Sequence, residues 1–355
     1  MTSPEAQLEF LTKLQRLFSE GDFTATYKFA LLMALADICV EQGQDNADAM
    51  TVLHKDIAIK FIDLYWQQTA PYGSELPNTS NSVLIQNNGV QAAVVTAIAA
   101  FRQKNPGVTP ITAKRSADFA DLVSKVAQTV SAQPVNYLQN LGGQTVPFLY
   151  ERKRGSIRLL PGICYCLRRF QPLVSQLSRS HWIQHVKGNR LNHPFLGEAD
   201  DLESFLFETP RQALLTIGVE LRKLMKNQCF YCGGKVHEAD VDHFIPFSQY
   251  PRDLMHNFVL AHPSCNRSKS DTLAAKGHLE HWREYTSRHS DDLAEIGILT
   301  GRSANLQSSL AVTRWSYGNG YASGAQAWVK AKEYELIDTF ALALAVAPVG
   351  NQWII

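Results

Sequence analysis

Three of the six cysteines in this 355-residue sequence fall within one short segment. Cys229 and Cys232 form a Cys-x-x-Cys turn, which can put two thiolates on one cation. His262-x-x-Cys265 follows further along the chain. Two such pairs complete the closed, tetrahedral site that is typical of structural zinc. The segment therefore predicts a Cys₃His zinc site, with His237 as the alternative fourth ligand.

A second kind of chemistry lies between the two pairs, in residues 241–246, which read VDHFIP. A carboxylate suits a hard cation such as Mg²⁺, whereas a neutral imidazole with a pKa near ~6.5 can take a proton from water. Asp242 and His243 therefore predict a metal ligand beside a general base. Neighbouring strand residues point to opposite faces, so both can serve one site only if the backbone turns or bulges there. Pro246 favours an early end to this strand.

The next segment predicts a returning strand, Phe258 to Ala261, and a helix that opens at Asn266. Asn266 offers a neutral oxygen ligand, which leaves most of the metal shell for water and phosphate. We expect Lys269 to meet a phosphate as a point charge.

About forty residues of this segment resemble the motif of the HNH (ββα-metal) endonucleases. They contain, in this order, Cys-x-x-Cys, Asp-His-x-x-Pro, Asn-x-Val-Leu and Cys-Asn-x-x-Lys. The resemblance implies His243 as general base and Asn257 as the residue that fixes the loop between the strands. It implies Asp242 and Asn266 as ligands of a catalytic Mg²⁺ or Mn²⁺. The zinc-bearing members usually have Cys where this chain has His262, and His is an ordinary zinc ligand.

This family resemblance implies a phosphodiester hydrolase that acts on DNA, with RNA as an alternative substrate. One site holds one metal and one base, so a monomer should nick one strand at a time. The competing interpretation is a catalytically silent, zinc-containing DNA-binding or scaffold protein. Cleavage that depends on divalent metal and on His243 separates the two.

A second resemblance lies near the N-terminus. Residues 27–42 are similar to the N-terminal regions of bacterial antiphage-defence HNH proteins, such as the nuclease component of Zorya-type systems. This likeness implies phage or other foreign DNA as substrate and protein partners within a defence system. It implies no mechanism.

The elements that position these residues are mainly helical. Apolar periodicity predicts two packed helices in the first forty residues and further helices later in the chain. We predict a mainly α fold with a small α+β catalytic domain of the ββα-metal type, held by structural zinc. A polar loop is expected at 73–82, a boundary at 197–201, and another loop at 317–324, which is rich in glycine and aromatic residues. The predicted domains are 1–200, a helical region with a possible DNA-binding or regulatory role; 205–290, the nuclease; and 291–355, a helical extension.

Positive charge is concentrated in residues 151–190, with nine Lys or Arg against one Glu, although the whole chain carries only +1. Two apolar runs, Val146 to Tyr150 and Ile157 to Leu160, flank Arg152, Lys153 and Arg154 and predict a hairpin with a basic tip. Helices followed by such a hairpin suit a winged-helix arrangement whose tip meets a phosphate backbone. A solvated turn is the equal alternative. We expect this block, Arg152 to Arg190, to supply the main DNA-tracking surface.

Bulk composition is that of a folded globular protein, 45% hydrophobic and 19% charged. The longest apolar run, Phe29 to Val40, is interrupted by Asp37 and is too short for a membrane helix. Sparse cysteines and the absence of a secretory pattern at the N-terminus predict a cytoplasmic location. The sequence does not indicate the oligomeric state.

Overall fold

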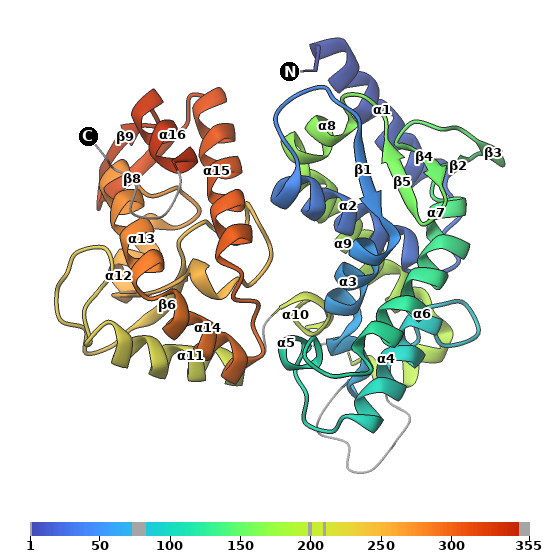
Figure 1. The fold of residues 1–355 in the computed structure, drawn as a ribbon, viewed down its shortest axis with the longest axis horizontal. Helices are drawn as coiled ribbons and strands as arrows, with labels where there is room; N and C mark the ends of the chain where they lie inside the picture. The colour runs from blue at the N-terminus through green and yellow to red at the C-terminus, as the bar shows by residue number, and fades with distance from the viewer. Residues whose placement is uncertain (1, 73–82, 198–200, 209–210, 348–355) are drawn as a thin grey trace. The chain divides into compact units, whose positions relative to one another are not determined.

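The computed structural model describes residues 2–72, 83–197, 201–208 and 211–347. Its chain divides into two compact units, Met1–Glu208 and Thr209–Ile355 (Figure 1). The polar loop expected at 73–82, and most of the boundary expected at 197–201, lie outside the described residues.

Unit 1 is mainly helical, with short strands between the helices. Its elements are α1 (Pro4–Glu20), α2 (Tyr27–Gln42), β1 (Met50–Leu53), α3 (His54–Tyr65), η1 (Gln67–Thr69), α4 (Ala93–Lys104), α5 (Pro110–Ala113), α6 (Phe119–Ala132), α7 (Pro134–Tyr137), β2 (Asn140–Leu141), β3 (Gln144–Thr145), β4 (Tyr150–Lys153), β5 (Ser156–Leu159), α8 (Ile163–Arg169), α9 (Gln171–Gly188), η2 (Arg190–Phe195) and α10 (Leu202–Phe207).

Helix α2 forms the centre of unit 1. Every residue from Tyr27 to Val40 is buried, and the helix packs against α3, α8 and α9. A helix that is apolar all round has no face to offer to water, so it must be enclosed on all sides. This explains why residues 27–40 show no amphipathic stripe.

A three-stranded sheet of order β1-β5-β4 joins two distant parts of unit 1. Strand β1 pairs antiparallel with β5, and β4 and β5 form the hairpin predicted around the basic residues. The predicted first strand, Val146 to Tyr150, is wrong, because β4 begins only at Tyr150. The buried side chain of Gln139 accepts from the backbone N–H groups of residues 148–150 and donates to the Tyr150 carbonyl. The N–H groups of Phe148 and Leu149 are therefore satisfied without a strand partner.

Unit 2 contains the segment that the sequence singled out. Its elements are α11 (Arg211–Leu224), β6 (Asp240–His243), η3 (Met255–Asn257), β7 (Phe258–Ala261), α12 (Pro263–Lys269), α13 (Lys276–Arg288), α14 (Ser290–Thr300), α15 (Leu306–Ala322), β8 (Gln326–Lys330), β9 (Glu333–Leu336) and α16 (Thr339–Val346). Strands β6 and β7 pair antiparallel in regular register, and α12 follows β7 directly.

The C-terminal part of unit 2 differs from a purely helical extension. It contains the hairpin β8–β9, and the backbone of Trp328 in β8 exchanges hydrogen bonds with Leu273 and Ala275. The loop predicted at 317–324 is wrong, because α15 continues to Ala322. A side-chain carbon at Gly320 would lie 2.6 Å from Ile337, so this glycine permits close packing and does not end the helix. Across the described parts of both units, no helix combines the length and apolar character needed to cross a membrane.

Candidate metal centres and catalytic residues

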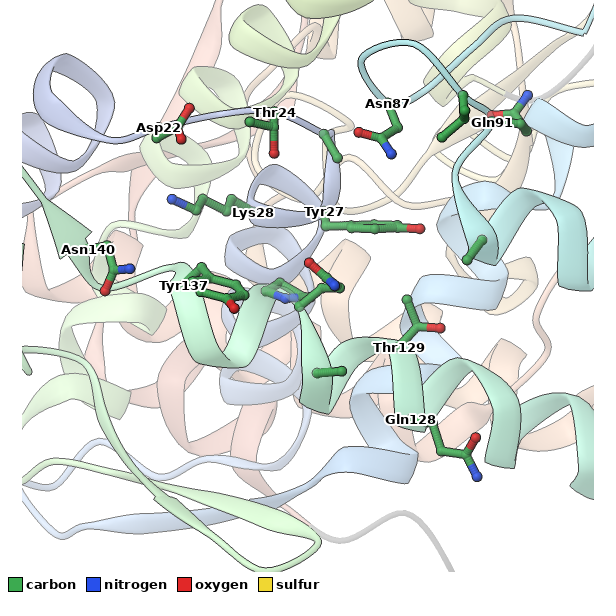
Figure 2. A pocket seen from close by; sticks show the side chains of 16 residues that line it. Asp22, Thr24, Tyr27, Lys28, Asn87, Gln91, Gln128, Thr129, Tyr137 and Asn140 are labelled. Carbon is green, nitrogen blue, oxygen red and sulfur yellow. The ribbon is translucent and has the colours of Figure 1, made fainter. Parts of the chain in front are cut away.

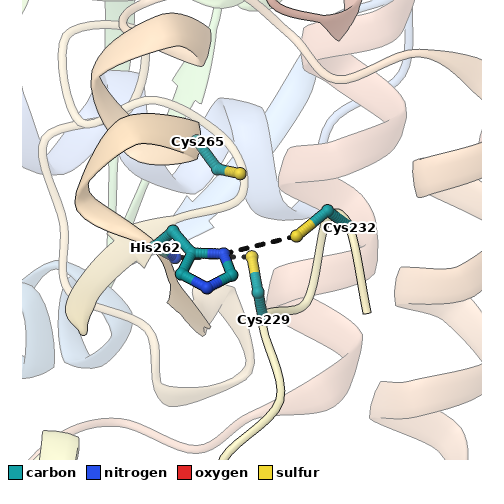
Figure 3. Close-up of side chains that lie close together, drawn as sticks. All are labelled: Cys229, Cys232, His262 and Cys265. Atoms are coloured by element: carbon teal, nitrogen blue, oxygen red, sulfur yellow. Dashed lines mark hydrogen bonds between the residues drawn. The ribbon is translucent and has the colours of Figure 1, made fainter. Parts of the chain in front are cut away.

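Four side chains of unit 2 form a group that can hold one metal ion (Figure 3). The ligand atoms of Cys229, Cys232, His262 and Cys265 all lie within 4.8 Å of one another, and Cys232 Sγ lies 3.3 Å from His262 Nδ1. Zinc binds sulfur at ~2.3 Å and imidazole nitrogen at ~2.0 Å, so the ligands of a tetrahedral ion lie roughly 3.5–3.8 Å apart. The four donor atoms, which lie within 4.8 Å of one another, reach this spacing with small side-chain movements. The donor set and its spacing therefore fit zinc. His237, the alternative fourth ligand, is exposed and outside this group.

Backbone contacts help to position two of the four ligands, Cys229 and His262. The Cys229 N–H donates to the Gly234 carbonyl, and the His262 N–H lies 3.4 Å from the Cys229 sulfur. His262 Nε2 lies 3.1 Å from the Lys235 carbonyl, which can only accept a hydrogen bond. Nε2 therefore carries the proton, and the Nδ1 lone pair faces the sulfurs.

The thiol of Cys265 shows why this group calls for a cation. Burial, together with the nearby sulfurs of Cys229 and Cys232, raises the pKa of Cys265 to about 12. Without a cation, the third thiolate would be crowded against two others in a partly dry site. A bound divalent ion would offset the repulsion between the three thiolates.

Asp242 points from the β6–β7 hairpin toward α12. Its side chain is 10% exposed, and Oδ2 accepts from the Tyr231 hydroxyl at 2.5 Å and from Lys269 Nζ at 3.2 Å. Both contacts use the same oxygen. Oδ1 makes no hydrogen bond or ion pair with the described residues and can accept a further ligand.

Lys269 does not have the surface position that the sequence predicted. It is 1% exposed, and its ammonium also donates to the His243 carbonyl at 2.9 Å. Burial lowers its pKa, and the Asp242 carboxylate opposes that effect. The expected direct phosphate contact is therefore wrong: Lys269 neutralises Asp242 and anchors the end of β6.

His243 ends β6 and has a carboxylate partner. Its Nε2 lies 2.6 Å from Asp253 Oδ1, and its ring packs against Phe247 and Phe258. The side chain is 21% exposed. No bulge brings it beside Asp242: the pairing of β6 with β7 is regular through both residues, so their side chains leave the strand on opposite sides.

Asn257 holds the chain that follows His243. Its Oδ1 accepts from the Ile245 N–H at 2.7 Å, and its Nδ2 donates to the Ile245 carbonyl at 2.9 Å. The Phe244 N–H also donates to the Asn257 carbonyl at 2.7 Å. With the side chain 4% exposed, this two-way contact fixes the backbone just beyond His243.

Asn266 meets a carboxylate that we did not predict. Its amide donates to Asp240 Oδ2 at 3.0 Å. Asp240 and Asp242 lie two apart on one strand, so both face α12. Strand alternation could have identified Asp240 from the sequence. The sequence also did not predict site roles for Asp253 and Tyr231. Each contacts its partner across a loop, so no local sequence pattern indicates the contact.

The basic block of unit 1 is not one surface. Arg168 is 3% exposed and pairs with Asp45, and Arg179 pairs with Glu203 and stacks on Phe207. These two arginines stabilise the core, so the expectation of a continuous tracking surface from Arg152 to Arg190 is wrong. The hairpin residues Arg152, Lys153 and Arg154 are exposed. Arg152 also donates to Asn136, and Lys153 pairs with Glu151.

Comparison with known proteins gives two family matches. Residues 229–272 match the HNH endonuclease model, and residues 7–203 match a domain of unknown function (DUF8808). No curated protein and no solved structure matches the chain. The second match spans more than half of the 355 residues. The chain therefore belongs to the DUF8808 family, and it carries an HNH endonuclease domain at its zinc-type ligand group.

Proposed function

We propose that this protein is a metal-dependent DNA endonuclease that nicks one strand by phosphodiester hydrolysis, with His243 as general base. The observation that carries the proposal is the hydrogen bond between His243 and Asp253, within a domain that matches the HNH endonuclease model. An imidazole held by a carboxylate and still partly exposed is arranged to accept a proton from water.

The partner of His243 defines which ring atom acts. A carboxylate can only accept, so the neutral imidazole carries its proton on Nε2 and donates it to Asp253. Nδ1 then has the lone pair that removes a proton from the attacking water. Asp253 also stabilises the imidazolium that forms, as a buried carboxylate does in Ser-His-Asp sites.

Asp242 and Asn266 fit a hard divalent cation, with Asp240 as an additional oxygen donor. All three offer oxygen atoms, which Mg²⁺ and Mn²⁺ prefer; Asp240 and Asp242 face α12, and Asn266 lies on it. Bound there, the metal would supply positive charge to the scissile phosphate and its leaving oxygen. Tyr231 and Lys269 hold the Asp242 carboxylate in one orientation for this purpose.

The side chains of Asp242 and His243 point to opposite sides of β6. A substrate that uses both must therefore lie across the end of this strand. Consecutive Cα atoms are only ~3.8 Å apart, and β6 ends at His243. A phosphate placed over this end can contact the Asp242 side and still present a water to His243. Asn257 fixes the backbone that follows this strand end.

We assign zinc to Cys229, Cys232, His262 and Cys265 as a structural ion. The first pair precedes β6 and the second pair begins α12, so one ion ties the loop before the hairpin to the helix after it. The catalytic oxygens lie on these same elements. Zinc would thus hold the site together without taking part in hydrolysis.

Unit 1 supplies a candidate DNA-binding module. Winged-helix domains typically have a strand between two helices and a later hairpin that pairs with this strand in one sheet. Unit 1 has this arrangement in its sheet of order β1-β5-β4, and α3 packs on α6 as two helices of a winged-helix domain do. In this interpretation Arg152, Lys153 and Arg154 lie on the wing and contact phosphates. This segment replaces the larger basic block as the proposed tracking surface.

The test is conversion of supercoiled plasmid to the nicked form in Mg²⁺ or Mn²⁺, compared between the natural protein and His243→Ala. Binding without cleavage by the natural protein would instead support a zinc-containing DNA-binding or scaffold protein.

A further inference from the structure

A pocket of about 750 Å³ opens in unit 1 (Figure 2). It lies between the start of α2, the loop before α4, the end of α6 and α7. Its volume falls within the range of small-molecule binding sites. All of its lining residues lie between Asp22 and Asn140, so the HNH residues contribute nothing to it. The nuclease chemistry therefore leaves this pocket without a role.

Lys28 gives the pocket a positive charge on a largely enclosed side chain. It is 8% exposed, and among the described residues its ammonium has no hydrogen bond or ion pair. The ammonium lies 5.3 Å from the centre of the Phe23 ring, and burial lowers the pKa of Lys28 while the nearby Asp22 raises it. A buried cation is costly unless an anion accompanies it. Asp22, which also lines the pocket, supplies part of the compensating negative charge, and an anion bound beside Lys28 would supply more.

Carboxamides line much of the remaining wall. Gln91 is already engaged, since its Oε1 accepts from two backbone N–H groups and its Nε2 donates to Leu84. Asn140 uses only Oδ1, which accepts from Thr145, so its Nδ2 donors remain. The side chain of Gln133 makes no hydrogen bond with the described residues. Such amides present donors and an acceptor together, as the edges of nucleobases do.

Aromatic rings complete the set. Figure 2 shows Lys28 and Tyr27 extending from the start of α2 toward opposite ends of the pocket, with Tyr137 and Asn140 at the Lys28 end. Tyr137 is 49% exposed on the short helix α7, so one ring face is available to a ligand. Stacking on such a ring tolerates any base. Asp22, at the rim, can accept from a sugar hydroxyl or an exocyclic amine.

We propose that this pocket binds a nucleotide, with the phosphate at Lys28 and the base stacked on Tyr137. Asn140 adds an amide donor to the phosphate, and Gln133 hydrogen-bonds the base edge. An inorganic anion would satisfy Lys28 but leave the tyrosine and the amides unused. The nucleotide is either a free molecule or the end of a DNA strand, since both present the same groups.

Calorimetric titration of the full chain without divalent metal tests this. The probes are the four ribonucleoside monophosphates, inorganic phosphate, and a short single-stranded DNA with a 5′-phosphate. Lys28→Met retains the length and apolar stem of the side chain, and Tyr137→Ala changes a half-exposed residue, so both variants should fold. Lys13→Met, on α1, is the matched control for loss of one positive charge.

We expect at least one mononucleotide, or the DNA strand, to bind with Kd below about 1 mM. Lys28→Met and Tyr137→Ala should each weaken binding by about tenfold or more, whereas Lys13→Met should not. Binding of the strand alone, with the same losses, identifies a DNA end as the ligand. The proposal is overturned if no probe binds, if phosphate alone binds as tightly as the nucleotides, or if both variants retain the natural affinity. Because no cleavage is measured, failure here leaves the nuclease proposal intact.

Discussion

Asp253 Oδ1 lies 2.6 Å from Nε2 of His243, and the two side chains are 10% and 21% exposed. The loop that carries Asp253 ends at Asn257, whose amide is bonded to the backbone of Ile245. One carboxylate therefore orients the candidate base, and one amide fixes the chain on its other side. This arrangement makes Asp253 a positioning residue in the account.

Asp253→Asn should lower the nicking rate by ~100-fold or more. An Asn amide can donate to Nε2, which would move the imidazole proton to Nδ1 and remove the catalytic lone pair. The DNA affinity and the melting temperature should stay the same, and Asp253→Glu should restore part of the rate. Asp292→Asn is the matched control, because Asp292 pairs with His289 at 2.9 Å on the surface. Equal losses in both Asn variants would refute the positioning role.

Cys229→Ser or Cys232→Ser should reduce the zinc content from about one ion per chain toward zero and lower the melting temperature. The free energy of zinc binding contributes directly to folding at a structural site. Elemental analysis and thermal unfolding measure the two effects. Cys166→Ala removes a buried cysteine of unit 1 and should leave the zinc content unchanged. Protein purified without chelator that contains no zinc would contradict the assignment.

His256 should make the protein less stable in mild acid. The residue is 1% exposed, both ring nitrogens lack hydrogen-bond partners among the described residues, and burial lowers its pKa to about 4. The unfolded chain takes up a proton near pH 6.5 and the folded chain only near 4. The contribution of His256 is therefore present above pH 6.5 and falls, by up to about 3 kcal/mol, as the pH drops between these values.

Urea unfolding at pH 7.5 and pH 5 measures this effect. His256→Leu should lose less stability on acidification than the natural protein. His237→Leu, at an exposed histidine, should behave like the natural protein. If His256→Leu and the natural protein lose the same stability, the buried neutral state is incorrect.

Replacement of Arg152, Lys153 and Arg154 by alanine should flatten the salt dependence of log affinity for duplex DNA by roughly two to three, since each phosphate contact contributes about 0.9. Affinity is measured from low to moderate salt without divalent metal. A control triple variant of Lys13, Arg16 and Lys104 removes the same charge from helices α1 and α4. Superimposable slopes for the hairpin variant and the natural protein would show that the hairpin does not meet DNA.

The sequence predicted the residues of the metal group because their chemistry depends on residue type and order along a short segment. Cys229, Cys232, His262 and Cys265 gather as the spacing indicated. The sequence alone could not predict the burial of Lys269. This burial depends on the contacts of Asp242 with Lys269 and with Tyr231, a residue that precedes the β6–β7 hairpin in the sequence. The same holds for Asp253, whose contact with His243 is made by a loop with no periodic pattern.

In unit 1, apolar periodicity correctly indicated helices. Local composition, however, led to a wrong prediction of one strand, Val146 to Tyr150, and of one basic surface, Arg152 to Arg190. The side chain of Gln139 accepts hydrogen bonds from the backbone N–H groups of residues 148–150. An apolar run alone would assign these residues to a strand. Arg168 and Arg179 count as positive charge in the sequence, yet Asp45 and Glu203 neutralise them from distant segments. Long-range pairing of this kind leaves no signal in one sequence.

The most direct test of the account is the nicking of supercoiled plasmid by purified protein with Mg²⁺ or Mn²⁺. We expect the natural protein to produce nicked circles, and EDTA to prevent this. His243→Ala should be at least ~100-fold slower while still binding DNA, because it loses only the general base. His289→Ala, at a surface histidine with a similar carboxylate partner, should cut normally. Cleavage by His243→Ala at the natural rate, or no cleavage by the natural protein with either metal, would contradict the central claim.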